Sequence, residues 1–253
     1  MKHMTDIVTA GMIVIGDEIL SGRTKDKNIG HLADMLTAVG IDLKEVRVVS
    51  DDREAIADAV NALRSRNTYV FTTGGIGPTH DDITADSIAF ALGLPCGYDD
   101  KAYRLLEAHY AKRGIEFTEA RKRMARMPEG ATHIDNPISI APGFHIANVY
   151  VMAGVPSIFQ AMLDNVIPTL QTGTKLSTRS VPSPLPEGTI GGPLGEVQKA
   201  HPDTIIGSYP QYSDNGFWTE IIIRSRSQEA LAAATEAVEN MLASMQPQEP
   251  SVN

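Results

Sequence analysis

Apolar and polar positions along the first third of the chain predict three strand–helix units. Residues 7–15, 42–49 and 68–73 are short, mostly apolar runs of the kind that form strands covered on both faces. Between them, apolar residues recur at helical spacing, as they do over residues 28–39. Strands that alternate with helices predict a parallel sheet with helices on both faces, so the fold class is α/β in three layers.

The middle of the chain repeats this arrangement less regularly. Residues 99–126 are charged and have a helical pattern, and residues 138–146 contain a Pro-Gly pair that indicates a hairpin or short loop. Residues 148–153 predict another strand, which a glycine and then an apolar helical pattern follow. This second strand–glycine–helix unit is expected to supply a further wall of the same ligand cleft.

Composition and periodicity divide the chain into two domains. We expect a large α/β domain over residues 1–172 and a small α+β domain of the split βαβ type over residues 190–246. Gly, Thr, Ser and Pro dominate the segment between them, residues 173–189, which is predicted to be a linker. Residues 247–253 are polar and are expected to form a flexible tail.

Glycines and carboxylates follow the predicted strand ends. These loops contain Gly16-Asp17-Glu18, Asp51-Asp52 and the stretch from Gly74 to Asp82. In parallel sheets, ligands bind outside the carboxyl ends of the strands, so the three loops are expected at one rim. Glycine lets the backbone approach a ligand closely, and a helix N-terminus favours an anion. The loops therefore predict a site for a phosphate-bearing small molecule and a divalent cation.

Simpler interpretations of the same residues remain open. A pair of glycines is most often only a turn, and Asp81 or Asp82 could be a helix N-cap, with Thr79 or Thr84 as competitors for that role. The loop is neither the dinucleotide-binding glycine fingerprint nor a Walker loop, because no Gly-Lys-Ser/Thr follows it.

Charge and cysteine content narrow the functional classes. The net charge of −9 argues against a nucleic-acid binder, which would need a basic face. The dense basic cluster at residues 121–126 is expected to be a solvated helix face, with attraction of phosphates or of a neighbouring subunit as the alternative. The single cysteine, Cys96, excludes an internal disulfide. No long apolar run or leader is present, so we expect a cytoplasmic protein without a membrane span.

Several of these segments together resemble a known family. In chain order, the segments similar to the molybdopterin-binding (MoaB/MogA/MoeA-type) domain family are Ile15 to Gly22 with Asp26 and Asn28, Val49 to Asp52, Thr72 to Thr84, Met127 to Ala131, Asn136-Pro137, Ala141 to Phe144 and Gly154 to Ser157. The resemblance covers about residues 5–170 and is greatest to the branch found at the N-terminus of CinA, the competence/damage-inducible protein. Ala153 departs from the pattern, since the family usually has proline there.

The resemblance implies a metal-dependent hydrolase that splits the pyrophosphate of ADP-ribose or a related nucleotide. The alternatives are molybdopterin binding or adenylylation in molybdenum cofactor biosynthesis, and a non-catalytic, nucleotide-binding regulator. Mg²⁺, Mn²⁺ or Co²⁺ suits a site of carboxylates better than zinc does, and a homo-oligomer is expected from the family.

The candidate site residues fall into three groups by role. The catalytic candidates are Asp82 and Asp51, and the candidate metal ligands are Asp17, Glu18 and Asp82. The candidate ligand-binding residues are Asn28, Thr73, Gly74, Gly75, Gly77, Thr79, Asp81, Pro142, Gly143, Gly154 and Ser157.

Overall fold

The computed structural model describes residues 7–213 and 216–245, which divide into two compact units. The first unit ends at Gly173 and the second begins at Thr174. No helix within the described residues is both long and apolar enough to span a bilayer. The predicted tail, residues 247–253, lies outside the described residues.

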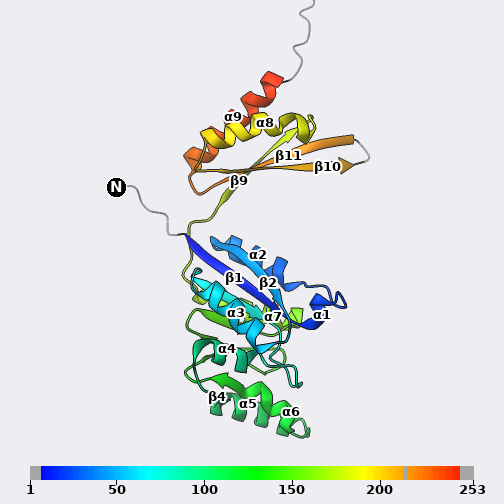
Figure 1. Ribbon diagram of the computed structural model, residues 1–253, viewed down its shortest axis with the longest axis vertical. Helices are drawn as coiled ribbons and strands as arrows, with labels where there is room; N and C mark the ends of the chain where they lie inside the picture. Colours follow the sequence, from blue (N-terminus) through cyan, green and yellow to red (C-terminus); the bar gives the residue numbers. More distant parts are fainter. Residues whose placement is uncertain (1–6, 214–215, 246–253) are drawn as a thin grey trace, which may run out of the picture. The chain divides into compact units, whose positions relative to one another are not determined.

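A six-stranded sheet in the order β2-β1-β3-β8-β7-β6 forms the centre of the first unit (Figure 1). Strands β2, β1, β3 and β8 are parallel, whereas β7 runs antiparallel between β8 and β6. The sheet is therefore parallel over the predicted strand–helix units and is extended by an antiparallel hairpin. Its strands are β1 (Val8–Ile15), β2 (Ile41–Val49), β3 (Tyr69–Thr73), β6 (Thr132–Ile134), β7 (Gly143–Ile146) and β8 (Val149–Met152).

Helices cover both faces of this sheet. One core contains Met12 and Val14 of β1 with the buried faces of α2 and α7, and the other contains Ile13 and Ile15 with α3, α4 and α5. Successive residues of β1 point to opposite faces, which explains why its sequence is apolar without alternation. The helices are α1 (Asp17–Leu20), α2 (Asn28–Ala38), α3 (Arg53–Arg64), α4 (Thr84–Leu92), α5 (Asp100–Lys112), α6 (Glu119–Lys122) and α7 (Pro156–Val166).

A smaller element, the two-stranded antiparallel ribbon of β4 (Cys96–Tyr98) and β5 (Arg126–Pro128), brackets α5 and α6. These parts lie together at one end of the first unit (Figure 1). Two 3₁₀ turns, at Arg123–Ala125 and Ile167–Thr169, complete the unit.

The carboxyl ends of the central parallel strands are aligned. Ile15 pairs with Val49, Val14 pairs with Thr73, and Thr73 pairs with Met152. The loops that follow β2, β1, β3 and β8 therefore leave the sheet at one edge, which is where a shared ligand site requires them.

The second unit has the order β9-α8-β10-β11-α9. Its sheet has the order β10-β11-β9, and β11 is antiparallel to both neighbours. Since β9 and β10 therefore run in the same direction on either side of β11, β9-α8-β10 is the expected split βαβ unit. The elements are β9 (Ser177–Ser183), α8 (Glu187–Ala200), β10 (Ile205–Ser213), β11 (Gly216–Ser225) and α9 (Gln228–Met245).

The interpretation of residues 173–189 as a linker is wrong for most of that segment. It contains all of β9 and the start of α8. Polar residues hide the strand in the sequence, because β9 is an edge strand in which only Val181 and Ser183 are buried. Pro182 is tolerated there because an edge strand does not need every backbone N–H. Packing of Ile190 and Leu194 likewise maintains α8 despite its glycines and Pro193.

Candidate functional site

A pocket of about 530 Å³ opens at the carboxyl ends of β1, β3 and β8. The loops after these strands and after β2 form its floor, and more distant segments add a wall. Of the candidate site residues, those that line it are Glu18, Asp51, Gly74, Gly75, Gly77, Asp81, Asp82 and Gly154. The loops at one rim, which sequence spacing predicts, are thus brought together around a single cavity.

Two glycines let the floor of the pocket close tightly. Gly74 has φ of +105°, and a Cβ there would lie 2.2 Å from the carbonyl oxygen of Ile15. Gly75 has φ of +67°, and its Cβ would lie 2.2 Å from Thr84 Oγ1. On the other side, a Cβ on Gly154 would lie 3.2 Å from the Cα of Gly74. The backbones that follow β1, β3 and β8 therefore touch directly, with no side chain between them.

Asn28 and Thr73 lie beneath this floor rather than in the pocket. Asn28 Nδ2 donates hydrogen bonds of 2.9 Å to Thr73 Oγ1 and to the carbonyl oxygen of Gly154. Thr73 Oγ1 in turn donates to the carbonyl oxygen of Ala153 at 2.9 Å. Both side chains are buried and tie the start of α2 to the ends of β3 and β8. Their contacts give them a supporting position behind the glycine loop.

The Asp81-Asp82 end of the glycine loop is held by its own hydrogen bonds. Asp82 Oδ2 accepts from Thr79 N at 2.7 Å and from Thr79 Oγ1 at 2.5 Å. Thr84 Oγ1 donates to the carbonyl oxygen of Gly74 at 3.0 Å. None of these side chains caps α4, because Ile83 is the N-cap residue and has no capping side-chain bond. The helix-cap interpretation of this motif is therefore wrong.

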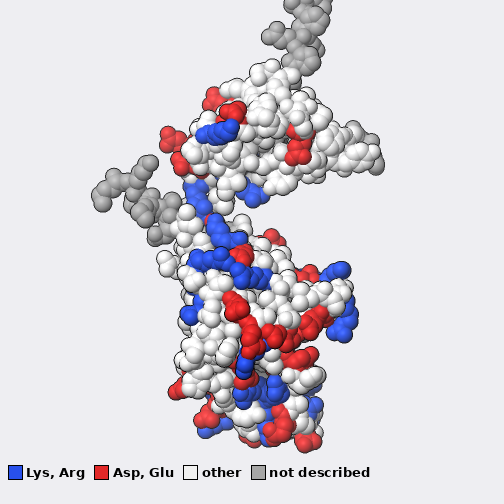
Figure 2. All heavy atoms as spheres, in the orientation of Figure 1, with Lys and Arg blue, Asp and Glu red and all other residues white. Residues whose placement is uncertain are grey.

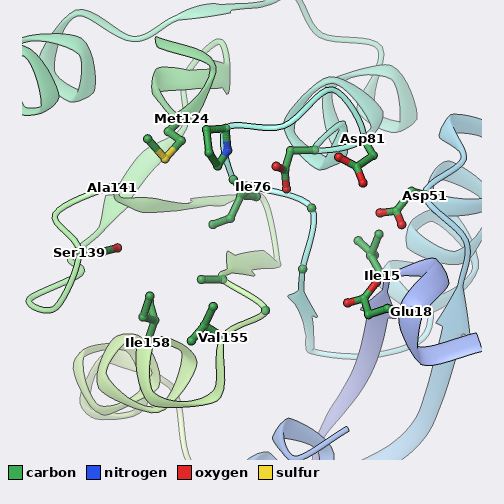
Figure 3. Close-up of a pocket in the computed structure, with 18 of the residues that line it drawn as sticks. Ile15, Glu18, Asp51, Ile76, Asp81, Met124, Ser139, Ala141, Val155 and Ile158 are labelled. Atoms are coloured by element: carbon green, nitrogen blue, oxygen red, sulfur yellow. The ribbon is translucent and has the colours of Figure 1, made fainter. Parts of the chain in front are cut away.

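Carboxylates from three loops gather on one side of the pocket. Figure 3 shows Glu18, Asp51 and Asp81 there, from α1 just after β1 and from the loops after β2 and β3. Burial raises the pKa of Asp51, and repulsion from Asp17, Glu18 and Asp81 raises it further against a hydrogen bond from the Asp17 amide. Acidic side chains also form a run across the middle of the first unit, toward α1 (Figures 1 and 2). The pocket is thus strongly negative at this side.

The carboxylates do not form a ready-made metal cage. Within residues 7–213 and 216–245, no three His, Cys, Asp or Glu side chains are arranged to hold a metal ion. Asp17, a candidate metal ligand, lies outside the pocket lining and contributes its backbone N–H, which donates to Asp51 Oδ2 at 2.9 Å.

The opposite side of the pocket is apolar. Figure 3 shows Ile76, Met124, Val155 and Ile158 around this part of the cavity, with Ala141 and Ser139 beside them. Met124, Asn136 and Ser139 are absent from our candidate residues, because they come from segments far from the glycine loop in sequence. The Asn136-Pro137 pair was the available signal for this wall, whereas nothing in the sequence indicates Met124.

Three remaining candidates lie near the pocket without lining it. Gly143 begins β7, where a Cβ would lie 2.3 Å from the carbonyl oxygen of Val151, and Pro142 precedes it. Ser157 is an exposed residue of α7. It does not cap that helix, since the N-cap residue is Val155 and Pro156 begins the first turn. The close packing of β7 on β8 accounts for the glycine at 143.

The basic cluster at residues 121–126 is engaged within the molecule. Arg126 forms an ion pair with Asp86, Lys122 forms one with Glu119, and the Arg121 guanidinium lies 4.9 Å from the Tyr110 ring centroid. Arg123 Nη2 donates to the carbonyl oxygen of Asp82 at 3.1 Å. The cluster is therefore not only a solvated helix face, and Arg123 braces the glycine loop from behind.

Fold and pocket define a three-layer α/β domain with a ligand site at the ends of its parallel strands. Comparison with known families agrees: residues 11–172 match the family described as "Probable molybdopterin binding domain". Residues 175–249 match the model described as the middle domain of FAD synthase.

Individual proteins show the same likeness. A relative from Aeropyrum pernix is 33% identical over 245 residues, which is 92% of this chain and 91% of the relative. One from Caldivirga maquilingensis is 37% identical over 166 residues, 64% of this chain and 65% of the relative. The crystal structure of CinA from Thermoplasma acidophilum, a protein of unknown function, is 30% identical with a TM-score of 0.60. It matches 64% of this chain and 98% of its own length. The chain belongs to the molybdopterin-binding-domain family, in its CinA-like branch.

Gly75 and Gly93 provide a matched test of the pocket floor, because both have φ of +67° but only Gly75 is packed against neighbours. We expect Gly93→Ala to cost about 1 kcal/mol of unfolding free energy, for the positive φ alone. Gly75→Ala should cost about 3 kcal/mol or more, because its Cβ collides with Thr84. Urea unfolding measures both, and equal losses would mean that the floor is not tightly packed.

Asp51→Asn is expected to raise the melting temperature at pH 7. The raised pKa of Asp51 means that the folded state favours its protonated form. Protonated Asp51 therefore stabilises the folded state below the ordinary carboxyl pKa of about 4. This stabilisation is lost as pH rises through the raised pKa of the folded state. At pH 7 the neutral amide avoids the cost of holding a charged carboxylate there. The increase in melting temperature should shrink below about pH 4, where the wild-type carboxyl is itself protonated. Thermal melts at several pH values measure it, and a lower melting temperature at pH 7 would contradict the electrostatic account.

Proposed function

We propose that the pocket binds a nucleotide of the ADP-ribose type and hydrolyses its pyrophosphate with the help of a divalent cation. The observation that carries the proposal is the convergence of Glu18, Asp51 and Asp81 beside the glycines of residues 74–77, which begin the glycine loop. A loop that binds anions and a group of carboxylates can serve the same site when a cation lies between the carboxylates and the phosphates of the ligand.

The donors available fit such a cation. The acidic side chains that line the pocket would bind a cation through carboxylate oxygens, and oxygen ligands suit Mg²⁺ or Mn²⁺. Mg²⁺ is usually held by one or two carboxylates together with water and substrate phosphates, so a group of three protein ligands is not required. Glu18 and Asp81 would hold the ion, which leaves Asp51 for proton transfer. Once bound, it would polarise the phosphoryl oxygens and ease the deprotonation of water.

The glycine loop would bind the diphosphate itself. Within the described part of the chain, no group accepts a hydrogen bond from the backbone N–H of Gly75, Ile76 or Gly77. Free backbone amides in a glycine-rich turn form a cradle for anions and would stabilise charge that develops on the phosphate during the reaction.

Asp51 is the side chain best suited to act as general base. Its Oδ2 accepts from the Asp17 amide, which leaves Oδ1 to accept a proton, and its raised pKa makes it a better base than an ordinary aspartate. Asp51 would take the proton of a water molecule as that water's oxygen bonds to phosphorus. The bridging P–O bond breaks, and the products are AMP and ribose 5-phosphate.

Molybdopterin binding is the second candidate function. It is favoured by the description of the family, whose model spans residues 11–172. Molybdopterin carries a phosphate and a flat ring, so the glycine loop and the apolar wall would suit it equally, for binding or for adenylylation. The match of residues 175–249 to a domain of FAD synthase leans toward nucleotide chemistry, as that protein's name indicates.

Asp82→Asn is expected to lower the rate of AMP release from ADP-ribose at least tenfold. The loss of one negative charge from the pocket lining lowers the attraction for the cation, while the amide oxygen can still accept from Thr79 and preserve the loop. The assay is run with Mg²⁺, Mn²⁺ and Co²⁺ in turn, and thermal melts check that stability is almost unchanged. Asp34→Asn, an identical change on the exposed part of α2, is the control and should leave the rate unaltered.

Three results would point elsewhere. A large fall in melting temperature for Asp82→Asn would mean that Asp82 mainly orders the loop. Turnover that needs no metal would contradict the proposed arrangement. The absence of turnover with every metal would favour the molybdopterin-binding function or a non-catalytic, nucleotide-binding regulator, which titration with pterin and nucleotide ligands distinguishes.

A further inference from the structure

We propose that the loop of residues 136–141 recognises the ring of the bound ligand, and that the Ser139 hydroxyl donates a hydrogen bond to an acceptor atom on that ring. The inference rests on the proposed function, because it takes the ligand's phosphates to lie at the acidic side of the pocket. The ring then occupies the apolar side, where this loop forms part of the wall.

Asn136 holds the loop in one conformation. Its buried side chain uses both ends: Nδ2 donates to Ser139 Oγ at 2.6 Å and to the carbonyl oxygen of Ala141 at 2.8 Å. Its Oδ1 accepts from the backbone amides of Ile138 and Ser139, each at 3.1 Å. A loop with this many internal bonds is rigid before any ligand arrives, which lowers the entropic cost of binding.

Ile140 indicates that this conformation is maintained against local strain. Its φ is +68°, a left-handed conformation that β-branched residues rarely adopt. The hydrogen bond from Ile140 N to the carbonyl oxygen of Asn136, at 3.1 Å, helps to keep the turn. Strained backbone persists where the surrounding structure enforces it, and it concentrates at binding sites. Here the turn brings Ser139 and Ala141 to the cavity on either side of Ile140.

The Ser139 hydroxyl has a proton to offer. Its oxygen accepts from Asn136, and within the described residues it donates to no other group. Figure 3 shows Ser139 on the cavity side of the loop, close to Ala141. A hydroxyl whose oxygen is fixed by one bond and whose hydrogen is free is a directed donor. Its complement is a ring nitrogen or an exocyclic carbonyl oxygen.

The surrounding side chains fit a flat heteroaromatic ring. Ile76, Met124, Val155 and Ile158 supply apolar surface around the same part of the cavity. A methionine thioether makes favourable contacts with aromatic rings and adapts to their shape. Few other polar side chains reach this side, so a single donor among apolar contacts would decide which ring is accepted. A purine and a pterin share this chemistry.

The test compares ligands with and without a heteroaromatic ring by calorimetric titration of the full chain. AMP and 6-hydroxymethylpterin carry a heteroaromatic ring, whereas ribose 5-phosphate carries only the sugar and its phosphate. We expect Ser139→Ala to weaken the binding of a ring-bearing ligand about threefold to tenfold, the effect of one lost hydrogen bond, and to leave ribose 5-phosphate unchanged. Ser139→Thr retains the hydroxyl and should restore affinity. Ile138→Ala alters an exposed side chain of the same loop outside the pocket lining and is the matched control.

Each outcome decides the inference. If wild-type protein binds a ring-bearing ligand and Ser139→Ala binds it equally well, the inference is wrong while the proposed function stands. An equal loss for ribose 5-phosphate also overturns it, because Ser139 would then shape the whole site. If only the pterin binds and Ser139→Ala weakens it, ring recognition holds and the nucleotide hydrolase proposal fails. Binding of neither ring-bearing ligand to the wild type overturns both.

Discussion

The direct contact of three backbones at Gly74 is the constraint on which the site depends. Gly74 lies against the carbonyl oxygen of Ile15, only 2.2 Å from where a Cβ on Gly74 would be, and against Gly154, whose Cβ would lie 3.2 Å from the Gly74 Cα. This contact brings together the ends of β1, β3 and β8, and with them the loops that carry the carboxylates and the apolar wall. The buried Asn28 secures the contact from below by bonding to Thr73 and to Gly154.

The pocket built on this floor combines two unlike halves. Its acidic half places Asp51 near other carboxylates, and the raised pKa of Asp51 shows that the folded state opposes its charge. The adjacent core, in which Ile13, Ile15 and Val60 are buried, provides stabilisation that offsets this local penalty. The apolar half is formed by segments from α7, from the 3₁₀ turn at Arg123–Ala125 and from the loop before β7. Such a pairing suits a ligand with phosphates at one end and a ring at the other.

The sequence predicts well those features that depend on local chemistry. The strands at Val8–Ile15 and Tyr69–Thr73 follow from apolar runs, and Asp52, a residue type that favours helix N-caps, caps α3. β9 was not predicted, because its partner β11 lies about 40 residues later in the chain and because only the alternate residues Val181 and Ser183 of β9 are buried. Composition alone does not distinguish an edge strand of Ser, Thr, Arg and Pro from a loop, and only its pairing with a partner strand does.

The candidate site could be predicted only in part for a related reason. The glycine and carboxylate motif marks the correct loops, but it does not say which side chains face the cavity. Asn28 and Thr73 have the right composition for ligand contacts, yet their nearest polar partners are backbone and each other. Met124 and Ser139 line the cavity although each lies more than 40 residues from the glycine loop in sequence. No local sequence pattern indicates that the fold brings them there.

The most direct measurement is a crystal structure of the protein with Mn²⁺ and a non-hydrolysable methylene analogue of ADP-ribose. Anomalous scattering locates Mn²⁺ independently of the ligand's density. Our account predicts a manganese peak between Glu18 and Asp81, with diphosphate oxygens bonded to the backbone amides of residues 75–77. A ligand bound away from this loop, or a diphosphate in the pocket with no manganese beside the carboxylates, would contradict it.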